Sequence, residues 1–206
     1  MLHSSDLAAS AWVQRFVSLI PKDQGPVLDL ACGSGRHTRF LLNAGYDVWS
    51  LDQNADLLAP LEALGARCFH VDLESSDGAD EAAQRTNWPF DPEQFSGIIV
   101  TNYLYRPLLL NLTLSLKRGG ILIYETFGAG NEVYGRPRRP DFLLQPEELL
   151  HTFLPDSPFS GESGKKNHCI AYEHGYVQQP HPAIVQRICL RSGISAHAGN
   201  HKSESI

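Results

Sequence analysis

The 206-residue sequence predicts an α/β protein with a mostly parallel, doubly wound sheet. Short segments rich in Val, Ile and Leu, bounded by Gly, Pro, Asn or Asp, have the pattern of buried strands. Segments with apolar residues at helical spacing lie between most of them, so crossover helices are expected on both faces. The expected strands are 26–30, 47–52, 67–72, 97–103 and 120–126, and the expected helices between them are 36–43, 55–64 and 108–116.

The two ends of the sequence predict further elements. A leading amphipathic helix is expected over 7–20, and another helix over 145–153 follows the Gly- and Pro-rich loop 128–144. Two more strands are expected at 168–177 and 183–190. The connection between them is too short for a crossover helix, so they should pair antiparallel. Gly45, Gly65 and Gly119 follow expected helices closely, as C-terminal caps do.

The whole chain, 1–206, is expected to form one domain. Within it, residues 1–22 form the leading helical segment over a cofactor pocket, and residues 192–206 form a flexible tail.

Composition and charge exclude several classes of function. The net charge of −6 and the pI near 5.8 argue against a broad nucleic-acid-binding surface. Arg136–Arg139 is a candidate small basic patch, although so short a run is more often a solvated loop. The sequence has no CxxC pair and no compact histidine spacing, so no metal site is expected. No signal peptide or membrane span is recognisable, which predicts a cytoplasmic protein without a membrane partner.

The segment Val27–Gly35 carries the clearest functional pattern. It reads as a buried strand that runs directly into the turn Ala31–Gly35 and then into a helix. Gly33 and Gly35 allow a tight turn and a close approach of a ligand to the backbone. Thr38 stands where the dinucleotide fingerprint has its third glycine, and this departure weighs against an NAD- or FAD-dependent oxidoreductase.

Acidic residues lie at three successive expected strand ends around this turn. Asp52 can accept hydrogen bonds from ribose hydroxyls, Asp72 from an exocyclic adenine amine, and Asp29 can bind the turn amides and balance a cationic ligand. A single Asp at a strand end usually forms a turn, but three around a glycine turn indicate a nucleoside-type ligand. Gln53, Leu73 and His37 are expected beside the same ligand.

These residues carry a resemblance to a known family. Val27–Gly35 resembles motif I of the class I S-adenosylmethionine-dependent methyltransferases, Val48–Asp52 the segment after motif I, and Val71–Leu73 motif II. Gly35–Val48 is similar to the tellurite-resistance type methyltransferases and their bacterial relatives. The resemblance implies a Rossmann-like sheet of seven strands with the last strand inserted antiparallel.

The resemblance also implies a cofactor and a set of contacts. S-adenosylmethionine would lie with its methionine part on the backbone of Ala31 and Gly33, its ribose on Asp52 and its adenine edge on Asp72. Trp12, with Phe16 on the same leading helix, would either cover the pocket or pack against the sheet.

The methyl acceptor should contact the residues that follow the fourth and fifth strands. Asn102, also expected near the cofactor, and Tyr103 lack the prolines of the Asn-Pro-Pro-Tyr motif found in amino-methylating relatives. Tyr103 and Arg106 could orient an acceptor, Arg106 favouring an anionic one, or could simply pack. Glu125 is the candidate general base, with an ion pair to a loop arginine as the alternative. Weaker candidates of the same kind are Asn131, Glu132 and Tyr134.

The leading hypothesis is an enzyme that transfers a methyl group to a small-molecule acceptor by in-line displacement. Three alternatives stay open: a nucleic-acid or protein methylase, a non-catalytic S-adenosylmethionine-binding protein, and a nucleotide-dependent oxidoreductase. The sequence leaves both the acceptor and the oligomeric state undetermined.

Overall fold

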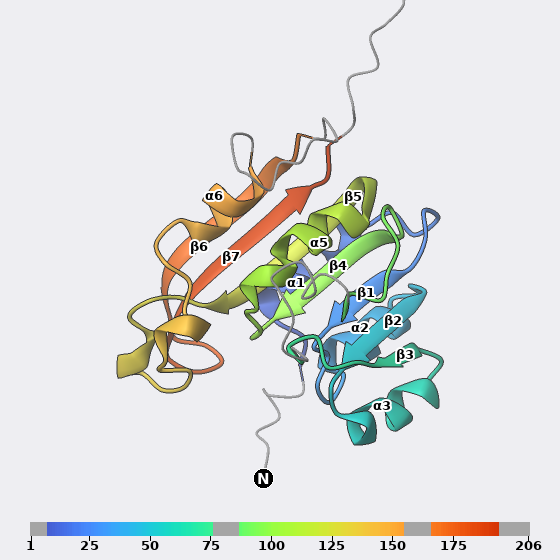
Figure 1. Ribbon diagram of the computed structural model, residues 1–206, viewed down its shortest axis with the longest axis horizontal. Helices are drawn as coiled ribbons and strands as arrows, with labels where there is room; N and C mark the ends of the chain where they lie inside the picture. Colours follow the sequence, from blue (N-terminus) through green and yellow to red (C-terminus); the bar gives the residue numbers. More distant parts are fainter. Residues whose placement is uncertain (1–7, 76–86, 155–165, 194–206) are drawn as a thin grey trace, which may run out of the picture.

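A seven-stranded mixed sheet with the order β3-β2-β1-β4-β5-β7-β6 forms the centre of the computed structural model, which describes residues 8–75, 87–154 and 166–193 (Figure 1). The strands are β1 (Val27–Leu30), β2 (Val48–Asp52), β3 (Arg67–His70), β4 (Phe95–Thr101), β5 (Leu116–Phe127), β6 (His168–Val177) and β7 (Ala183–Arg191). The α-helices are α1 (Ala11–Phe16), α2 (Arg36–Asn43), α3 (Ala55–Glu62), α5 (Leu109–Ser115) and α6 (Glu148–Phe153). Short 3-10 helices are η2 (Val17–Leu19), η4 (Arg106–Leu108), η5 (Asn131–Val133) and η6 (Pro140–Phe142).

The strand directions confirm the predicted fold. β1 to β5 pair in parallel, whereas β7 lies antiparallel between β5 and β6. The arrows in Figure 1 show β7 running against its neighbours. The short connection between β6 and β7 produces the antiparallel pair that the sequence predicts.

Helices cover both faces of the sheet, because alternate residues of each central strand point to opposite sides. On β4, Ile98 and Val100 pack with α5 and α6, whereas Ile99 packs with α1 and α2. The six residues from Phe95 to Val100 are all buried, as expected for a central strand covered on both faces.

Two helices begin later than predicted, each for a local reason. α1 starts at Ala11 because the Ser10 hydroxyl accepts a hydrogen bond from the amide of Trp12 and caps the helix. α6 starts at Glu148 because Glu147 has a left-handed backbone, with φ of 62°.

Two expectations, one about the end of a helix and one about the start of the C-terminal tail, are wrong. Gly119 does not cap a helix but lies inside β5, where its amide donates to the carbonyl of Ser192. Ser192 was expected to begin a flexible tail, yet it is buried and its own amide donates to Gly120. The rest of the expected tail, from residue 194, and the first seven residues of the leading segment lie outside the described residues.

The topology places a ligand edge at the carboxyl ends of β1 and β4. The connection from β1 runs through α2 on one face, and the connection from β4 runs through α5 on the other. Chains that leave two adjacent strands in opposite directions open a crevice at that edge. No helix among the described residues is long and apolar enough to cross a bilayer.

Candidate functional site

The glycine turn between β1 and α2 leaves one side of its backbone open. Ala31, Gly33 and Gly35 all have positive φ, of 50°, 54° and 78°. A Cβ atom at Gly35 would collide with Leu61 of α3, so this glycine is needed for packing. Among the described residues, and apart from its two neighbours in the chain, no atom would lie within 4 Å of a Cβ atom at Gly33, so no described side chain covers the backbone there.

Asp52 fixes the shape of the turn. One carboxylate oxygen accepts a hydrogen bond from the Gly33 amide at 2.8 Å, and the other accepts from the Asn54 amide at 2.9 Å. The turn-binding role that the sequence suggested for Asp29 therefore belongs to Asp52. Because a carboxylate has four lone pairs, Asp52 keeps acceptor capacity for a further donor.

Asp29 instead holds the start of α2 against the sheet. The side chain is 1% exposed, and the Thr38 hydroxyl donates to it at 2.6 Å while lying 2.8 Å from the Ser50 hydroxyl. Burial raises the pKa of Asp29 to about 6, although the hydrogen bonds of Thr38 oppose the rise. Thr38, which replaces the third glycine of the dinucleotide fingerprint, thus ties α2 to both β1 and β2.

His37 is buried between three elements at the same edge. Its Nε2 accepts a hydrogen bond from the Ser10 amide at 3.1 Å, and its Nδ1 lies 3.4 Å from the Thr101 hydroxyl. Burial lowers the pKa of His37 to about 3, with a smaller contribution from the charge of Arg36. The ring is therefore neutral at pH 7, and because Nε2 is an acceptor, the proton resides on Nδ1.

Glu125 belongs to an ion-pair network that crosses three strands. Its Oε1 accepts from the Ser10 hydroxyl at 2.9 Å, and its Oε2 lies 2.6 Å from Nε of Arg187 in an ion pair without linear hydrogen-bond geometry. Arg187 also pairs with Glu173 of β6 at 3.3 Å, and Glu173 pairs with Arg15 of α1 at 3.1 Å. This geometry favours the ion-pair interpretation of Glu125, with a partner on β7 and not in a loop.

Sequence reasoning missed both partners of Glu125. Arg187 lies directly opposite Glu125 in the β5–β7 register, and no pattern in the sequence gives that register. Ser10 did carry a signal, because serine before an apolar helical segment is a common N-cap.

Trp12 and Phe16 pack in the core beneath α1. They are 2% and 7% exposed, and their rings meet edge to face with centroids 4.6 Å apart. The indole nitrogen of Trp12 donates to the carbonyl of Ile188 at 3.4 Å. This arrangement favours packing against the sheet over direct contact with a cofactor.

Asp72 and Leu73, two neighbouring residues expected beside the cofactor, lie in different environments after β3. Asp72 is exposed, and its carboxylate accepts from the Glu74 amide at 3.0 Å, which is a turn-forming contact. Leu73 is 5% exposed and belongs to the core. Asp72 is therefore available to a ligand at the edge, whereas the Leu73 side chain points away from solvent.

Gln53 and Asn102 lie exposed just beyond the ends of β2 and β4. The carbonyl of Gln53 is 3.0 Å from a ring nitrogen of His70. Asn102 has φ of 55°, and its amide donates to the carbonyl of Glu125 at 2.9 Å. Both side chains remain at the edge that carries the glycine turn.

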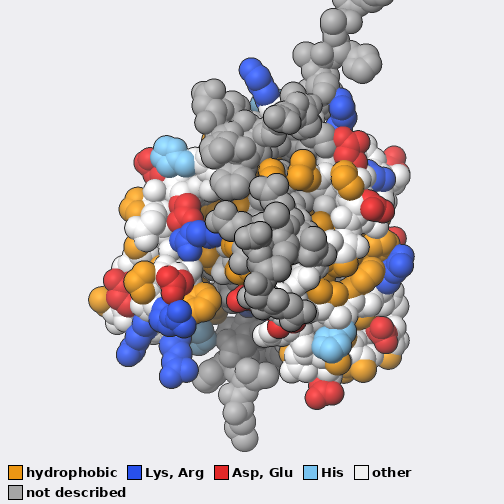
Figure 2. Space-filling view, in the orientation of Figure 1, with side chains coloured by type: hydrophobic (Ala, Val, Ile, Leu, Met, Phe, Trp, Pro, Cys, Tyr) orange, Lys and Arg blue, Asp and Glu red, His pale blue; other side chains and the backbone are white. Residues whose placement is uncertain are grey.

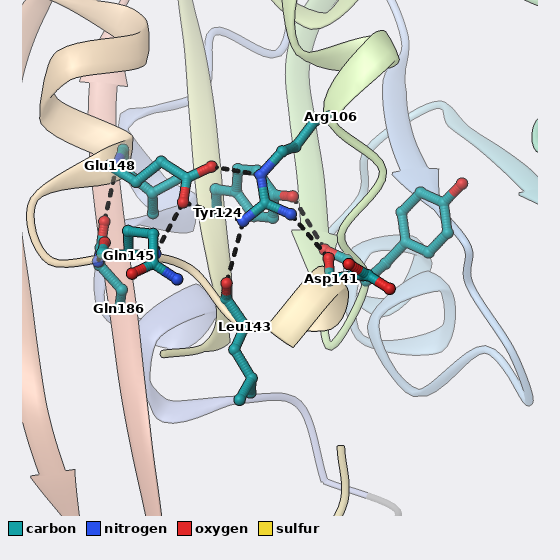
Figure 3. A network of polar contacts seen from close by, with 9 residues as sticks. Arg106, Tyr124, Asp141, Leu143, Gln145, Glu148 and Gln186 are labelled. Atoms are coloured by element: carbon teal, nitrogen blue, oxygen red, sulfur yellow. Dashed lines mark hydrogen bonds and ion pairs between the residues drawn. The ribbon is translucent and has the colours of Figure 1, made fainter. Parts of the chain in front are cut away.

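The guanidinium of Arg106 is hydrogen-bonded to other groups of the protein, as Figure 3 shows. Its Nε and Nη2 donate to the two carboxylate oxygens of Glu148 at 2.7 and 3.0 Å. Nη1 and Nη2 also donate to the carbonyls of Asp141 and Leu143. The guanidinium thus clamps the loop after β5 to the start of α6, which favours the packing alternative over an acceptor-orienting role.

Tyr103 is half-buried, and burial raises the pKa of its hydroxyl well above the usual range. The charge of Glu74 and a hydrogen bond to it contribute to the same shift. The carbonyl of Tyr103 accepts from the Tyr124 hydroxyl at 2.9 Å. Such a phenol does not ionise near pH 7, so Tyr103 can act only as a neutral hydrogen-bonding group.

A surface hollow of about 520 Å³ lies beside this clamp and not at the glycine turn. Its walls come from Arg106, from the loop after β5 and from α6. Within the described ranges, no group of three or more His, Cys, Asp or Glu side chains is arranged to hold a metal ion.

Comparison with known proteins supports the family resemblance. The family model described as tellurite resistance protein TehB matches residues 12–76, a segment that runs from α1 through the glycine turn to β3. The resemblance predicted from the motifs is thereby confirmed over this segment. No curated protein matches the sequence significantly.

Solved structures of methyltransferases share the fold. TehB from Haemophilus influenzae is 19% identical with a TM-score of 0.60, and the match covers 87% of this chain but only 60% of that one. An S-adenosylmethionine-dependent methyltransferase from Mesorhizobium loti is 16% identical with a TM-score of 0.61, covering 90% of this chain and 99% of the other. One from Methanosarcina mazei is 13% identical with a TM-score of 0.58, covering 91% and 99%. At these identities the likeness establishes the shared fold.

Proposed function

We propose that this protein is an S-adenosylmethionine-dependent methyltransferase that acts on a small-molecule acceptor. The observation that carries the proposal is the open backbone at Gly33, held by the Asp52 carboxylate at the carboxyl ends of β1 and β2. A glycine turn beside an acid at the end of the next strand suits a nucleoside ligand, because the ligand can approach a backbone without a side chain and the carboxylate can accept from its hydroxyls.

The residues at this edge fit the cofactor that the family resemblance implies. The backbone of Ala31 and Gly33 would hold the methionine part, the free lone pairs of Asp52 would accept from the ribose hydroxyls, and Asp72 would accept from the adenine amine. Asp29, one residue before β1 ends, would favour a cationic ligand in its ionised form. When bound, the cofactor supplies a methyl group on a sulfonium, which is already an activated leaving group.

The candidate bases near this edge are all engaged in other contacts. Both ring nitrogens of His37 and both carboxylate oxygens of Glu125 have partners, and burial keeps the Tyr103 hydroxyl protonated by raising its pKa. An acceptor that arrives as an anion, such as a thiolate, needs no base. The protein would then contribute mainly by holding the acceptor in line with the methyl group.

Calorimetry on the full chain tests cofactor binding. We expect micromolar affinity for S-adenosylmethionine and no heat with NADH or RNA. Asp52→Ala should weaken binding about 5- to 100-fold, because ribose hydroxyls lose their acceptor. Asp56→Ala, an exposed acid four residues later, is the matched control and should bind as the wild type does. Equal affinity of the two variants would remove the ribose assignment.

An assay of S-adenosylhomocysteine release distinguishes an enzyme from a non-catalytic binding protein. The purified chain is incubated with S-adenosylmethionine and panels of thiols, phenols, amines and RNA, and S-adenosylhomocysteine is measured. Release with one class of small molecule supports the proposal. Release with RNA alone, or binding without release across all panels, contradicts it.

A further inference from the structure

We propose that the loop Gly128–Leu144 binds a phosphate or carboxylate group carried by an apolar organic acceptor, with Arg136 and Arg138 as the anion-binding residues. The inference rests on the proposed function, because it treats this loop as the wall of the acceptor site. The supporting observations are the position of the loop, its anchoring, its charge and its exposed apolar side chains.

The loop leaves the carboxyl end of β5, the same edge of the sheet that carries the glycine turn. Figure 1 shows it beyond the arrowhead of β5, beside the start of β7. Its two ends are joined, since Gly128 and Leu144 form a parallel bridge and the Ala129 amide donates to Leu144 at 2.9 Å. The loop is therefore a closed excursion on the ligand edge, where long loops often line substrate sites.

A buried asparagine anchors the tip of the loop. Asn131 is 1% exposed, its side-chain oxygen accepts from the Ile184 amide at 3.2 Å, and its side-chain nitrogen donates to the Pro137 carbonyl at 3.3 Å. Asn131 was a weaker candidate for acceptor contact, and the structure gives it a scaffold role. The arginines on either side of Pro137 are thus presented from a fixed backbone.

The charge of this loop is opposite to that of the whole chain. Arg136, Arg138 and Arg139 are exposed within four residues of a protein whose net charge is −6. Arg139 pairs with Asp141 at 2.8 Å, whereas Arg136 and Arg138 have no ion pair with any described residue. Arg138 donates through Nε to the Gly135 carbonyl at 3.3 Å, which leaves its terminal nitrogens available. Two arginines that have no carboxylate partner among the described residues attract an anionic group and can donate to its oxygens.

Apolar side chains lie exposed on the same loop. Val133 is 76% exposed and Tyr134 is 46% exposed, and the Tyr134 ring lies 5.3 Å from the ring of Tyr176, which is 53% exposed. Figure 2 shows Lys and Arg side chains gathered with hydrophobic ones at the end of the molecule where Figure 1 places this loop. Cationic and aromatic groups side by side complement a ligand with an anionic group on an apolar body.

An NMR titration of the full chain with phenyl phosphate tests the proposal, with phenol as the uncharged control ligand. We expect phenyl phosphate, but not phenol, to shift the backbone amide signals of residues 132–142. The variant R136A/R138A should weaken this binding about tenfold, and added salt should weaken it further. The control R118A/R191A removes two arginines at the opposite edge of the sheet and should leave it unchanged.

The outcomes separate this inference from the proposed function. Equal binding by R136A/R138A and its control, or equal binding of phenol, overturns the inference while S-adenosylmethionine calorimetry on the same proteins stays positive. If the wild-type protein does not bind S-adenosylmethionine, the proposed function is overturned instead. Binding of a single-stranded RNA oligonucleotide that is lost in R136A/R138A, without binding of phenyl phosphate, also overturns the inference, because the ligand would then be a nucleic-acid backbone.

Discussion

The buried histidine of α2 should make the folded protein sensitive to acid in a calculable way. The pKa of His37 falls from 6.5 to about 3 on folding. Below about pH 6.5 the unfolded chain binds a proton at this histidine, whereas the folded chain does not until the pH approaches 3. The free energy of unfolding is therefore higher above about pH 6.5 and decreases as the pH falls toward 3. Between about pH 8 and pH 5 the loss amounts to about 2 kcal/mol of unfolding free energy.

Asp29 opposes this effect, and both must be counted. Its pKa rises from 3.8 to about 6 on folding, so it contributes stability below pH 4 that is lost as the pH rises through 6. Going from about pH 8 to pH 5, Asp29 restores about 1 kcal/mol. The wild type should thus lose only about 1 kcal/mol from the two groups together.

Urea unfolding of the wild type and of His37→Gln at several pH values isolates the histidine. Glutamine retains an acceptor for the Ser10 amide but has no proton to gain, so all other titrating groups cancel in the difference between the two proteins. We expect that difference to change by about 2 kcal/mol from pH 8 to pH 5, in favour of the variant at low pH. Two stability curves that stay parallel over this range would refute the buried, neutral histidine.

Three further substitutions test the contacts around the edge. Ala31→Gly should raise the unfolding free energy by about 0.5–1 kcal/mol in urea denaturation, because the strain of φ at 50° exceeds the added freedom of the unfolded chain; a loss of stability would contradict this. Thr38→Val should lower the unfolding free energy by about 2–3 kcal/mol near pH 8, because the ionised Asp29 loses its hydroxyl donor. The decrease should become smaller below pH 6, and a decrease independent of pH would argue against that bond. Arg106→Gln should cost about 1–3 kcal/mol and speed amide exchange in residues 141–149, since the clamp on Glu148 is lost; unchanged exchange there would exclude the clamp.

Much of the fold was predictable because it depends on local patterns. Short apolar segments bounded by Gly, Pro, Asn or Asp, helical segments between them and a short final connection predicted the strands, their directions and the helices on both faces. The errors lie where one residue departs from its neighbours' conformation. Glu147 delays α6 by adopting a left-handed backbone, and Gly119 extends a strand where a cap was expected.

The order of the residues was enough to predict the chemistry available at the ligand edge. The glycine turn and the acids at the ends of β2 and β3 follow from the order of residues, since the carboxyl ends of parallel strands must meet at one edge. It could not determine which of these groups are already engaged. Asp52 holds the turn and Asp29 holds α2, although the sequence suggested that Asp29 holds the turn.

The roles of Glu125 and Arg106 depend on partners that only the folded chain brings close to them. Each pairs with a residue more than forty positions away, Glu125 with Arg187 and Arg106 with Glu148. Such pairs depend on strand register and loop path, which are set by the packing of the whole domain and leave no periodic signal in the chain. The order of residues therefore predicts which polar groups lie at this edge, and the packing decides which of them are already paired.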